Sequence, residues 1–252
     1  MGKKRSSACG YAEPRTGDPR RGISVSTRRG WGPGASEIKL ATAAITVLIF
    51  IMSAAMPSAQ TKRARLFPAL DLGLLETPDR DQWQKPDLIM DALSIADGSK
   101  VADLGAGGGW FTIRLARRVG PNGRVYAEDI QRSMIEAIQR RVARENLANV
   151  IAVLGTATDP HLPSGLDAVL IVDVYHELDD PVTLLKNATK TLKPTGRLGI
   201  VGYNPGNGGP GPAAAQRIDP DAFMKSAAAA GLTFIRREDV PPFQFLLVFG
   251  RP

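Results

Sequence analysis

The chain has 252 residues, 43% of them hydrophobic, which suits a globular protein of one large domain or two small ones. The formal net charge of +7 is concentrated in residues 1–61, which hold nine Lys or Arg against three Asp or Glu, while residues 62–252 hold 23 against 22. A near-neutral domain disfavours nucleic acid as its substrate. The single cysteine, Cys9, excludes an intramolecular disulfide.

The N-terminal quarter of the chain divides into two parts. Residues 1–36 are rich in Gly, Ser, Pro and Arg without apolar periodicity, which predicts a disordered basic leader. Residues 37–61 contain an apolar run, residues 38–59, whose unbroken core is short for a membrane span and long for the apolar part of a signal peptide. We expect this run to anchor the protein in a membrane or to export it, with a cytoplasmic domain as the alternative. Residues 62–252 are the predicted folded domain.

That domain begins with a turn and a helix. Pro78 and Asp79 indicate the turn, and Pro86 suits the first turn of a helix whose apolar residues recur at helical spacing as far as Ile95. The next turn leads into the stretch that organises the domain.

Residues 100–119 predict a strand, a tight glycine turn and a helix. Asp103 lies in an apolar run of strand length, four glycines follow within the next six residues, and apolar residues at helical spacing continue to Val119. Glycine permits positive φ and close approach of a ligand, and the N–H groups that open the helix favour an anionic group. Asp129 ends the next predicted strand, residues 124–130, about 20 residues past the glycines, where a doubly wound sheet places a carboxylate against ribose hydroxyls.

Two classes of ligand, dinucleotides and S-adenosylmethionine, compete for such a turn. The dinucleotide pattern G-x-G-x-x-G would require glycine where Trp110 stands. The pattern D-x-G-x-G-x-G, from Asp103 to Gly109, resembles the first motif of the class I S-adenosylmethionine-dependent methyltransferases. The segments YAEDI, LDAVLIVDVYHEL and LKPTGRLGIVGY follow in the order of that family, so the resemblance covers residues 80–252.

The resemblance implies a Rossmann-like α/β fold with a doubly wound, mostly parallel, seven-stranded sheet and an antiparallel last strand. The residue pattern agrees with this architecture, because apolar runs of strand length alternate with helical periodicity. Beyond residue 130 we expect a helix that is capped by Ser133 and runs through Glu136 to Glu145. Further helices are expected at residues 182–192 and 220–230, and strands at residues 150–154, 166–172, 197–203, 232–237 and 243–249.

The family motifs also imply a cofactor site for S-adenosylmethionine. Its residues are Asp103, Gly105, Ala106, Gly107, Gly109, Glu128, Asp129, Ile130, Thr158, Asp159 and Asp173. Asp103 is expected to orient the loop and the methionine amino end, and Asp129 is preferred to Glu128 for the ribose because only one of two adjacent strand residues faces a ligand. Ile130 packs either on the adenine or in the core. Either Thr158 or Asp159 contacts the adenine, unless Asp159 only begins a turn.

The segment DVYHEL is the predicted site of methyl transfer, with Asp173, Tyr175 and His176 as candidate catalytic residues. Methyl transfer depends mainly on positioning and exclusion of water, so few catalytic side chains are required. A histidine, with an ordinary pKa near 6.5, is the natural base for an acceptor that must lose a proton. A structural, hydrogen-bonding histidine is the alternative. The two histidines, His161 and His176, show no metal-ligand spacing.

Three further features bear on the acceptor, which the sequence does not identify. Residues 80–86, RDQWQKP, resemble a segment that covers the cofactor in bacterial relatives, with Trp83 as part of a lid or as a core residue. The glycine-rich residues 204–212 are either a substrate-side flap or a tolerated insertion, and Arg217 is a candidate for binding a substrate anion. We therefore expect a methyltransferase for a small or lipid-like acceptor. The alternatives are a cofactor-binding domain without turnover and a nicotinamide-dependent oxidoreductase.

Overall fold

The computed structural model describes residues 66–206, 208–240 and 242–252, which belong to one structural unit, Thr61–Pro252. The predictions made for the basic leader and for residues 37–61 lie outside these residues. In the part of the chain that is described, no helix is both long enough and apolar enough to cross a membrane.

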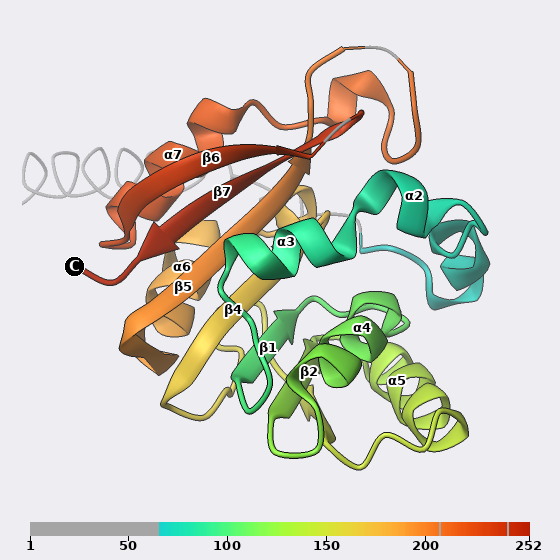
Figure 1. The fold of residues 1–252 in the computed structure, drawn as a ribbon. Helices are drawn as coiled ribbons and strands as arrows, with labels where there is room; N and C mark the ends of the chain where they lie inside the picture. The colour runs from blue at the N-terminus through green and yellow to red at the C-terminus, as the bar shows by residue number, and fades with distance from the viewer. Residues whose placement is uncertain (1–65, 207, 241) are drawn as a thin grey trace, which may run out of the picture. The chain divides into compact units, whose positions relative to one another are not determined.

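A seven-stranded sheet forms the centre of the unit, with strand order β3-β2-β1-β4-β5-β7-β6 (Figure 1). Neighbouring strands from β3 through β5 are parallel, and β7 runs antiparallel to both β5 and β6. This confirms the predicted doubly wound sheet with its antiparallel last strand. The strands are β1 (Lys100–Leu104), β2 (Arg124–Asp129), β3 (Val150–Leu154), β4 (Leu166–Val172), β5 (Leu192–Tyr203), β6 (Thr233–Val240) and β7 (Gln244–Gly250).

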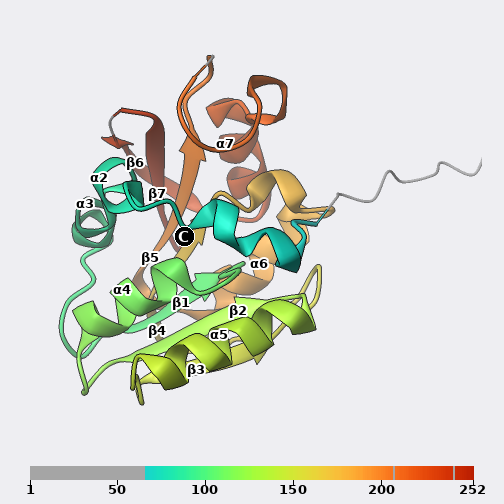
Figure 2. The same ribbon diagram turned by 90° about the vertical axis from the view of Figure 1, so that its right-hand side faces the viewer.

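Helices cover both faces of the sheet (Figure 2). One face carries α3 (Pro86–Ala92), α4 (Trp110–Val119) and α5 (Arg132–Arg144), and the other carries α6 (Pro181–Thr191) and α7 (Pro220–Ala229). The short elements are η1 (Ala69–Leu75), α2 (Arg80–Gln84), η2 (Tyr175–Glu177) and η3 (Ala214–Gln216).

The central strand β4 shows why its sequence is apolar without alternation. Val169 and Ile171 face the helices α6 and α7, whereas Ala168 and Leu170 face α3 and α4, and all four are fully buried. A parallel strand covered on both faces has no solvent side, so every position favours an apolar residue. The carboxyl ends of β1, β2 and β4 consequently meet at one edge of a rigid sheet.

Several boundaries differ from the sequence-based expectation, and two of the differences have a local cause. The helix α5 begins at Arg132, directly after the turn in which Asp129 accepts a hydrogen bond from the Gln131 N–H. Gln131 is therefore at the cap position and Ser133 lies inside the helix, so the predicted Ser133 cap was wrong. Strand β5 starts at Leu192 rather than at Arg197, because Leu192 already pairs with Leu166 before the register shifts in the β4–β5 ladder.

Candidate cofactor and acceptor site

The glycine turn has the backbone that its sequence predicts. Gly105, Gly107 and Gly109 adopt φ values of +72°, +54° and +79°, a region that is costly for residues with a Cβ. A Cβ on Gly105 would lie 2.6 Å from Val174 Cγ2, so this part of the turn packs tightly against the loop that follows β4. A Cβ on Gly107 would meet no atom within 4 Å, so the turn is open above Gly107.

Two carboxylates at the end of β2 hold this turn. Asp129 Oδ2 accepts a hydrogen bond of 3.0 Å from the Gly107 N–H, and Glu128 Oε2 accepts one of 3.2 Å from the Gly105 N–H. Both acids contact the turn, because the turn wraps over the strand end and reaches the side chains of both strand faces. The preference for Asp129 over Glu128 at the ribose stays a prediction. Burial raises the pKa of Asp129 and raises that of Glu128 to about 8, so Glu128 is protonated at neutral pH.

Asp103 ties the first strand to the helix after the turn. Its carboxylate is 2% exposed and accepts a hydrogen bond of 2.6 Å from Thr112 Oγ1 in α4. Burial raises its pKa to about 6, although the Thr112 hydroxyl and the charge of Arg80 oppose the shift. This contact supports the part of its predicted role that concerns the orientation of the loop.

The residues predicted to contact adenine differ in their exposure and in their hydrogen bonds. Ile130 is 38% exposed, which favours the ligand-facing alternative over packing in the core. Asp159 Oδ1 accepts a hydrogen bond of 2.9 Å from the His161 N–H, so its carboxylate builds the turn at Pro160. The side chain of Thr158 is exposed, while its carbonyl accepts a hydrogen bond from Asn187. Ala106 contributes its backbone, because its N–H donates to the Glu128 carbonyl at 2.8 Å.

Asp173 ends β4 in a strained backbone conformation, with φ at +60°. Its carboxylate accepts hydrogen bonds of 3.0 and 3.1 Å from the Gln244 side-chain amide and a further one from the Tyr203 phenol. The surrounding protein removes water from this carboxyl and raises its pKa to about 6. The same burial, together with the charge of Asp173, raises the pKa of Tyr203, so the phenol stays protonated.

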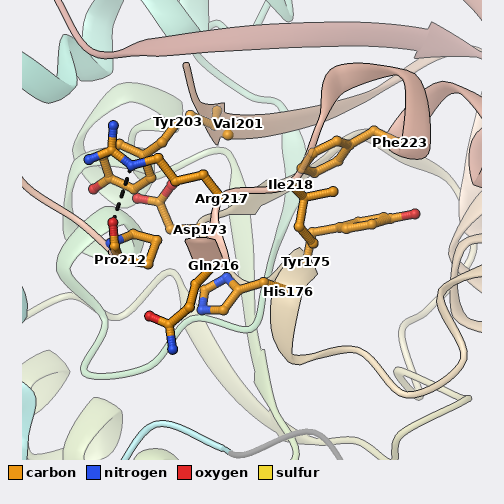
Figure 3. Close-up of a pocket in the computed structure, with 11 residues that line it drawn as sticks. Asp173, Tyr175, His176, Val201, Tyr203, Pro212, Gln216, Arg217, Ile218 and Phe223 are labelled. Atoms are coloured by element: carbon orange, nitrogen blue, oxygen red, sulfur yellow. Dashed lines mark hydrogen bonds between the residues drawn. The ribbon is translucent and has the colours of Figure 1, made fainter. Parts of the chain in front are cut away.

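His176 and Tyr175 are adjacent in sequence but point in different directions (Figure 3). The Tyr175 ring is buried against Phe223 with centroids 4.2 Å apart, and its hydroxyl faces Ala222 in α7. This placement does not support the predicted catalytic role of Tyr175. His176 lies at the pocket with its side chain 30% exposed, and burial lowers its pKa, so the ring is neutral at pH 7.

A small pocket that is open to solvent lies beside Asp173 and His176. Figure 3 shows Tyr203, Arg217 and Asp173 on one side of it and Ile218, Tyr175 and Phe223 on the other. Arg217 donates its hydrogen bonds to carbonyl oxygens of residues 204–212, including those of Pro212 at 3.1 Å and Gly208 at 2.8 Å. These bonds occupy all three guanidinium nitrogens, so Arg217 organises the glycine-rich loop and the prediction of anion binding is not supported.

Comparisons with known proteins agree with this geometry. A family model described as a methyltransferase domain matches residues 101–196. The chain is 32% identical over 110 residues to a demethylmenaquinone methyltransferase of Geobacillus, covering 43% of this chain and 47% of that protein. It is 32% identical over 119 residues to nocamycin O-methyltransferase of Saccharothrix syringae, covering 46% and 42%. The chain thus spans less than half the length of these curated relatives.

A solved structure extends the agreement beyond the matched segment. The crystal structure of an S-adenosylmethionine-dependent methyltransferase from Aquifex aeolicus superimposes with a TM-score of 0.70 at 24% identity, covering 73% of this chain and 98% of that one. Residues 101–196 therefore match the methyltransferase-domain family, and the described residues have the fold of a solved S-adenosylmethionine-dependent methyltransferase. Both findings agree with the family that the glycine motif predicted.

The residues of this site fit S-adenosylmethionine. The space above Gly107 is open, the Asp129 carboxylate lies at its rim, and the side chain of Ile130 is exposed next to that acid. Glu128 Oε1 is a further indication, since it is buried without a hydrogen-bond partner among the described residues. A buried polar atom of this kind calls for an unseen partner such as a ligand or a water molecule.

Sequence reasoning missed several residues that build this site. Gln84 Nε2 donates to Gln244 Oε1 at 2.6 Å, and Gln244 in turn donates to Asp173, so the two fully buried glutamines connect α2 to the end of β4. Trp83 is buried, with its ring 6.3 Å from that of Tyr203, and therefore packs on the acceptor side of the site. The one sequence signal for Gln244 was its position as the polar first residue of the otherwise apolar strand QFLLVFG.

The segment before α2 also crosses the site, and no sequence pattern indicated this. The Phe67 N–H donates to Glu177 Oε2 at 2.9 Å, and the Phe67 carbonyl accepts from the Gln131 side chain at 3.1 Å. Farther along, Leu72 lies against Gly108, where an added Cβ would meet its Cδ2 at 3.1 Å. Residues 67–72 therefore run from the end of β4, past the end of β2, to the glycine turn.

Proposed function

We propose that this protein transfers a methyl group from S-adenosylmethionine to a small molecule bound in the pocket beside His176. The observation that carries the proposal is the contact between the two halves of the site. Gly105 of the cofactor turn packs against Val174, which directly follows Asp173 and precedes His176 by two residues. A cofactor bound at the turn would therefore have the pocket as its neighbour. The curated relatives are named for small-molecule acceptors, a menaquinone precursor and nocamycin.

In this reaction the main task of the protein is to position the reactants. When bound, S-adenosylmethionine supplies a methyl group on a sulfonium, which is already a reactive donor. The glycine turn and Asp129 hold the nucleoside, and the pocket holds the acceptor and limits water, so that an in-line attack becomes effectively unimolecular. Arg217 keeps the loop of residues 204–212 folded over this pocket.

His176 is the residue that we propose takes a proton from the acceptor. Its burial lowers the pKa of the imidazole, so the ring is in its basic form at neutral pH. Its Nε2 lies 3.7 Å from Glu177 Oε1, and that carboxylate stabilises the imidazolium that forms when the proton is taken. An acceptor with an oxygen or nitrogen nucleophile requires this step.

The pocket walls suggest the kind of acceptor. Val201, Ile218 and Phe223 form an apolar surface, with the polar groups of Asp173, His176 and Tyr203 at one end. Such a site favours a small, largely apolar molecule oriented by a few hydrogen bonds. The near-neutral charge of residues 62–252 argues against a nucleic-acid acceptor.

Two measurements on the full-length purified protein test the proposal. Isothermal titration calorimetry with S-adenosylmethionine, S-adenosylhomocysteine and NAD should give binding of the first two and none of the third. NAD binding alone would favour the oxidoreductase alternative. A screen of candidate acceptors with a labelled methyl donor should then show transfer to one chemical class, whereas cofactor binding without transfer to any acceptor would favour a binding domain without turnover.

We further propose that residues 38–59 hold the methyltransferase at a membrane. The support is the apolar run itself and the exposed leucines that begin the described part of the chain, Leu66, Leu70 and Leu74, which are 40%, 99% and 73% exposed. Fractionation of cells with an antibody to the domain tests this. A full-length product found only in the soluble cytosolic fraction would contradict both anchorage and export.

A further inference from the structure

Four of the ten large apolar side chains that are exposed among the described residues lie within ten consecutive positions. They are Leu66, Leu70, Leu74 and Leu75, which are exposed by 40%, 99%, 73% and 36%, and the last three belong to η1. Isolated apolar side chains on a protein surface are ordinary, whereas a local cluster of them indicates a surface that binds something apolar.

The segment that carries these leucines is attached to the domain on both sides of them. At its start, the Phe67 N–H donates to Glu177 Oε2 at 2.9 Å and the Phe67 carbonyl accepts from the Gln131 side chain at 3.1 Å. At its end, Glu76 forms an ion pair with Arg141 of α5. The exposed leucines therefore belong to a segment with a fixed position on the domain, and we call their exposed side the leucine surface.

The sequence just before the leucine surface indicates what it contacts. Lys62, Arg63 and Arg65 directly precede Leu66, and only two residues separate these cations from the apolar run of residues 38–59. No Asp or Glu occurs from residue 38 to residue 70. An apolar run, a group of cations and a cluster of exposed leucines are together complementary to a lipid bilayer, whose anionic head groups attract cations and whose acyl region accepts leucine side chains.

We propose that the leucine surface is a membrane-contact surface, which inserts Leu70 and Leu74 into the head-group region of a bilayer that contains anionic lipid. This inference rests on the proposed anchorage through residues 38–59 and extends it from the anchor to the folded domain. The apolar run holds the chain at the bilayer, and η1 determines which side of the domain faces the lipid. Because Phe67 contacts Glu177, the residue after His176, this is the side on which residues 67–72 cross the site.

A fluorescent probe at a single cysteine tests the contact in the full-length protein. Cys9 is the only cysteine, so Leu70→Cys in a Cys9→Ser background carries one nitrobenzoxadiazole label, whose emission reports the polarity around it. Ala229→Cys in the same background is the matched control, because Ala229 is an exposed residue of α7. Figure 1 shows α7 on the opposite side of the domain from η1, which lies near the start of the coloured chain.

The labelled proteins are reconstituted into phosphatidylcholine vesicles with and without about 30% phosphatidylglycerol, a source of the anionic charge that attracts Lys and Arg. With the anionic lipid, the Leu70→Cys probe should shift to shorter wavelength, gain at least about 2-fold in emission and be quenched by a nitroxide on the lipid acyl chain. The Ala229→Cys probe should not respond. In phosphatidylcholine alone, the response of the Leu70→Cys probe should fall at least about 2-fold, because the cations lose their attraction to the surface.

A second variant excludes an effect of the probe itself. A label on Leu75→Cys should respond in the same way and lose its response when Leu70→Ser and Leu74→Ser are combined with it. Since all three leucines are exposed, these substitutions leave the core intact, and circular dichroism checks this. A labelled Leu75→Cys protein that responds equally with and without the two serines would contradict insertion of Leu70 and Leu74.

The remaining outcomes separate this inference from the anchorage. If the protein stays with the vesicles while the Leu70→Cys probe reports water, the anchorage holds and the leucine surface is not a membrane contact. A blue-shifted probe in the absence of vesicles would overturn the inference in favour of a protein partner. Dependence on protein concentration would then identify a second copy, and independence would identify another part of the same chain. If the full-length protein associates with neither kind of vesicle, the anchorage and this inference both fail, whereas methyl transfer is measured separately and is not affected.

Discussion

The cofactor half and the acceptor half of the site are built in different ways. In the cofactor half, Asp103, the glycine turn and Asp129 come from one strand–helix–strand segment, and each contact joins residues close in sequence. In the acceptor half, Gln84 donates to Gln244, 160 residues away in the chain, and Gln244 donates to the carboxylate of Asp173. The first half is a local motif and the second is a product of the whole fold. Variants that affect one half and spare the other test whether this division is functional as well as structural.

Asp129→Ala should produce the largest effect, confined to the cofactor half. If the carboxylate accepts hydrogen bonds from two ribose hydroxyls, its removal loses two charge-assisted bonds, each worth about 1.5–3 kcal/mol. The dissociation constant of S-adenosylhomocysteine, measured by calorimetry, should rise at least about 100-fold. Glu136→Ala, an exposed acid on α5, is the matched control and should bind normally. Retention of near-normal affinity by Asp129→Ala would remove the central assumption about this half.

His176→Ala should reduce turnover about 100-fold and leave the affinity for the cofactor unchanged, because loss of a general base acts on the acceptor half. The pH dependence gives a second readout. Burial lowers the pKa of His176 from 6.5, so the wild-type rate should rise with pH through an apparent pKa below that value and then level off. The variant should lack this rise. His161→Ala, the other histidine, is exposed and is the control. Unchanged turnover in a folded His176→Ala protein would assign the proton transfer elsewhere.

Arg217→Ala should have a smaller effect, confined to binding of the acceptor. Without the guanidinium, the carbonyl oxygens of residues 204–212 lose their shared hydrogen-bond donor. We therefore expect the KM for the acceptor found by the labelled-methyl screen to rise about 10-fold. Arg217→Lys is the matched variant. It keeps the charge but not the fork that reaches several carbonyls, so it should behave like the alanine variant. A lysine variant with wild-type KM would show that charge, rather than folding of the loop, is what matters.

The difference between the halves also explains how far sequence reasoning reached. The strand, turn and helix of residues 100–119 were predictable because glycine spacing and apolar periodicity are properties of neighbouring residues. The roles of Gln84 and Gln244 were not, since their environments are created by segments far away in the chain. Tyr175 illustrates the same limit, because its direction depends on Phe223 in α7.

Within the predictable half, the contacts of the adjacent acids Glu128 and Asp129 were an exception. Strand alternation correctly assigns Glu128 and Asp129 to opposite faces, but the rule assumes a ligand on one face. The glycine turn passes over the strand end and donates a hydrogen bond to the acid on each face, a geometry that depends on the three-dimensional fold.

Glu128→Gln has the smallest expected effect, on stability, and sharpens the comparison within the cofactor half. The pKa of Glu128 is about 8 in the folded protein against an ordinary 4.5, so between these values the folded state binds more protons than the unfolded state. Wild-type stability therefore falls as pH rises from about 4.5 to 8 through this group, and the glutamine variant lacks that loss.

We expect the two proteins to be similar in stability at pH 4 and the variant to be more stable at pH 8. The full shift corresponds to roughly 5 kcal/mol, and relaxation around the carboxyl reduces it, so a difference of about 1 kcal/mol, equivalent to about 2–4 °C in Tm, is the expected minimum. Thermal unfolding followed by circular dichroism at a series of pH values measures this. The raised pKa values of Asp103 and Asp173 are common to both proteins and cancel in the difference. Parallel curves of Tm against pH would mean that Glu128 is ionised in the folded protein, and that the glycine turn is held by two charged carboxylates instead of one.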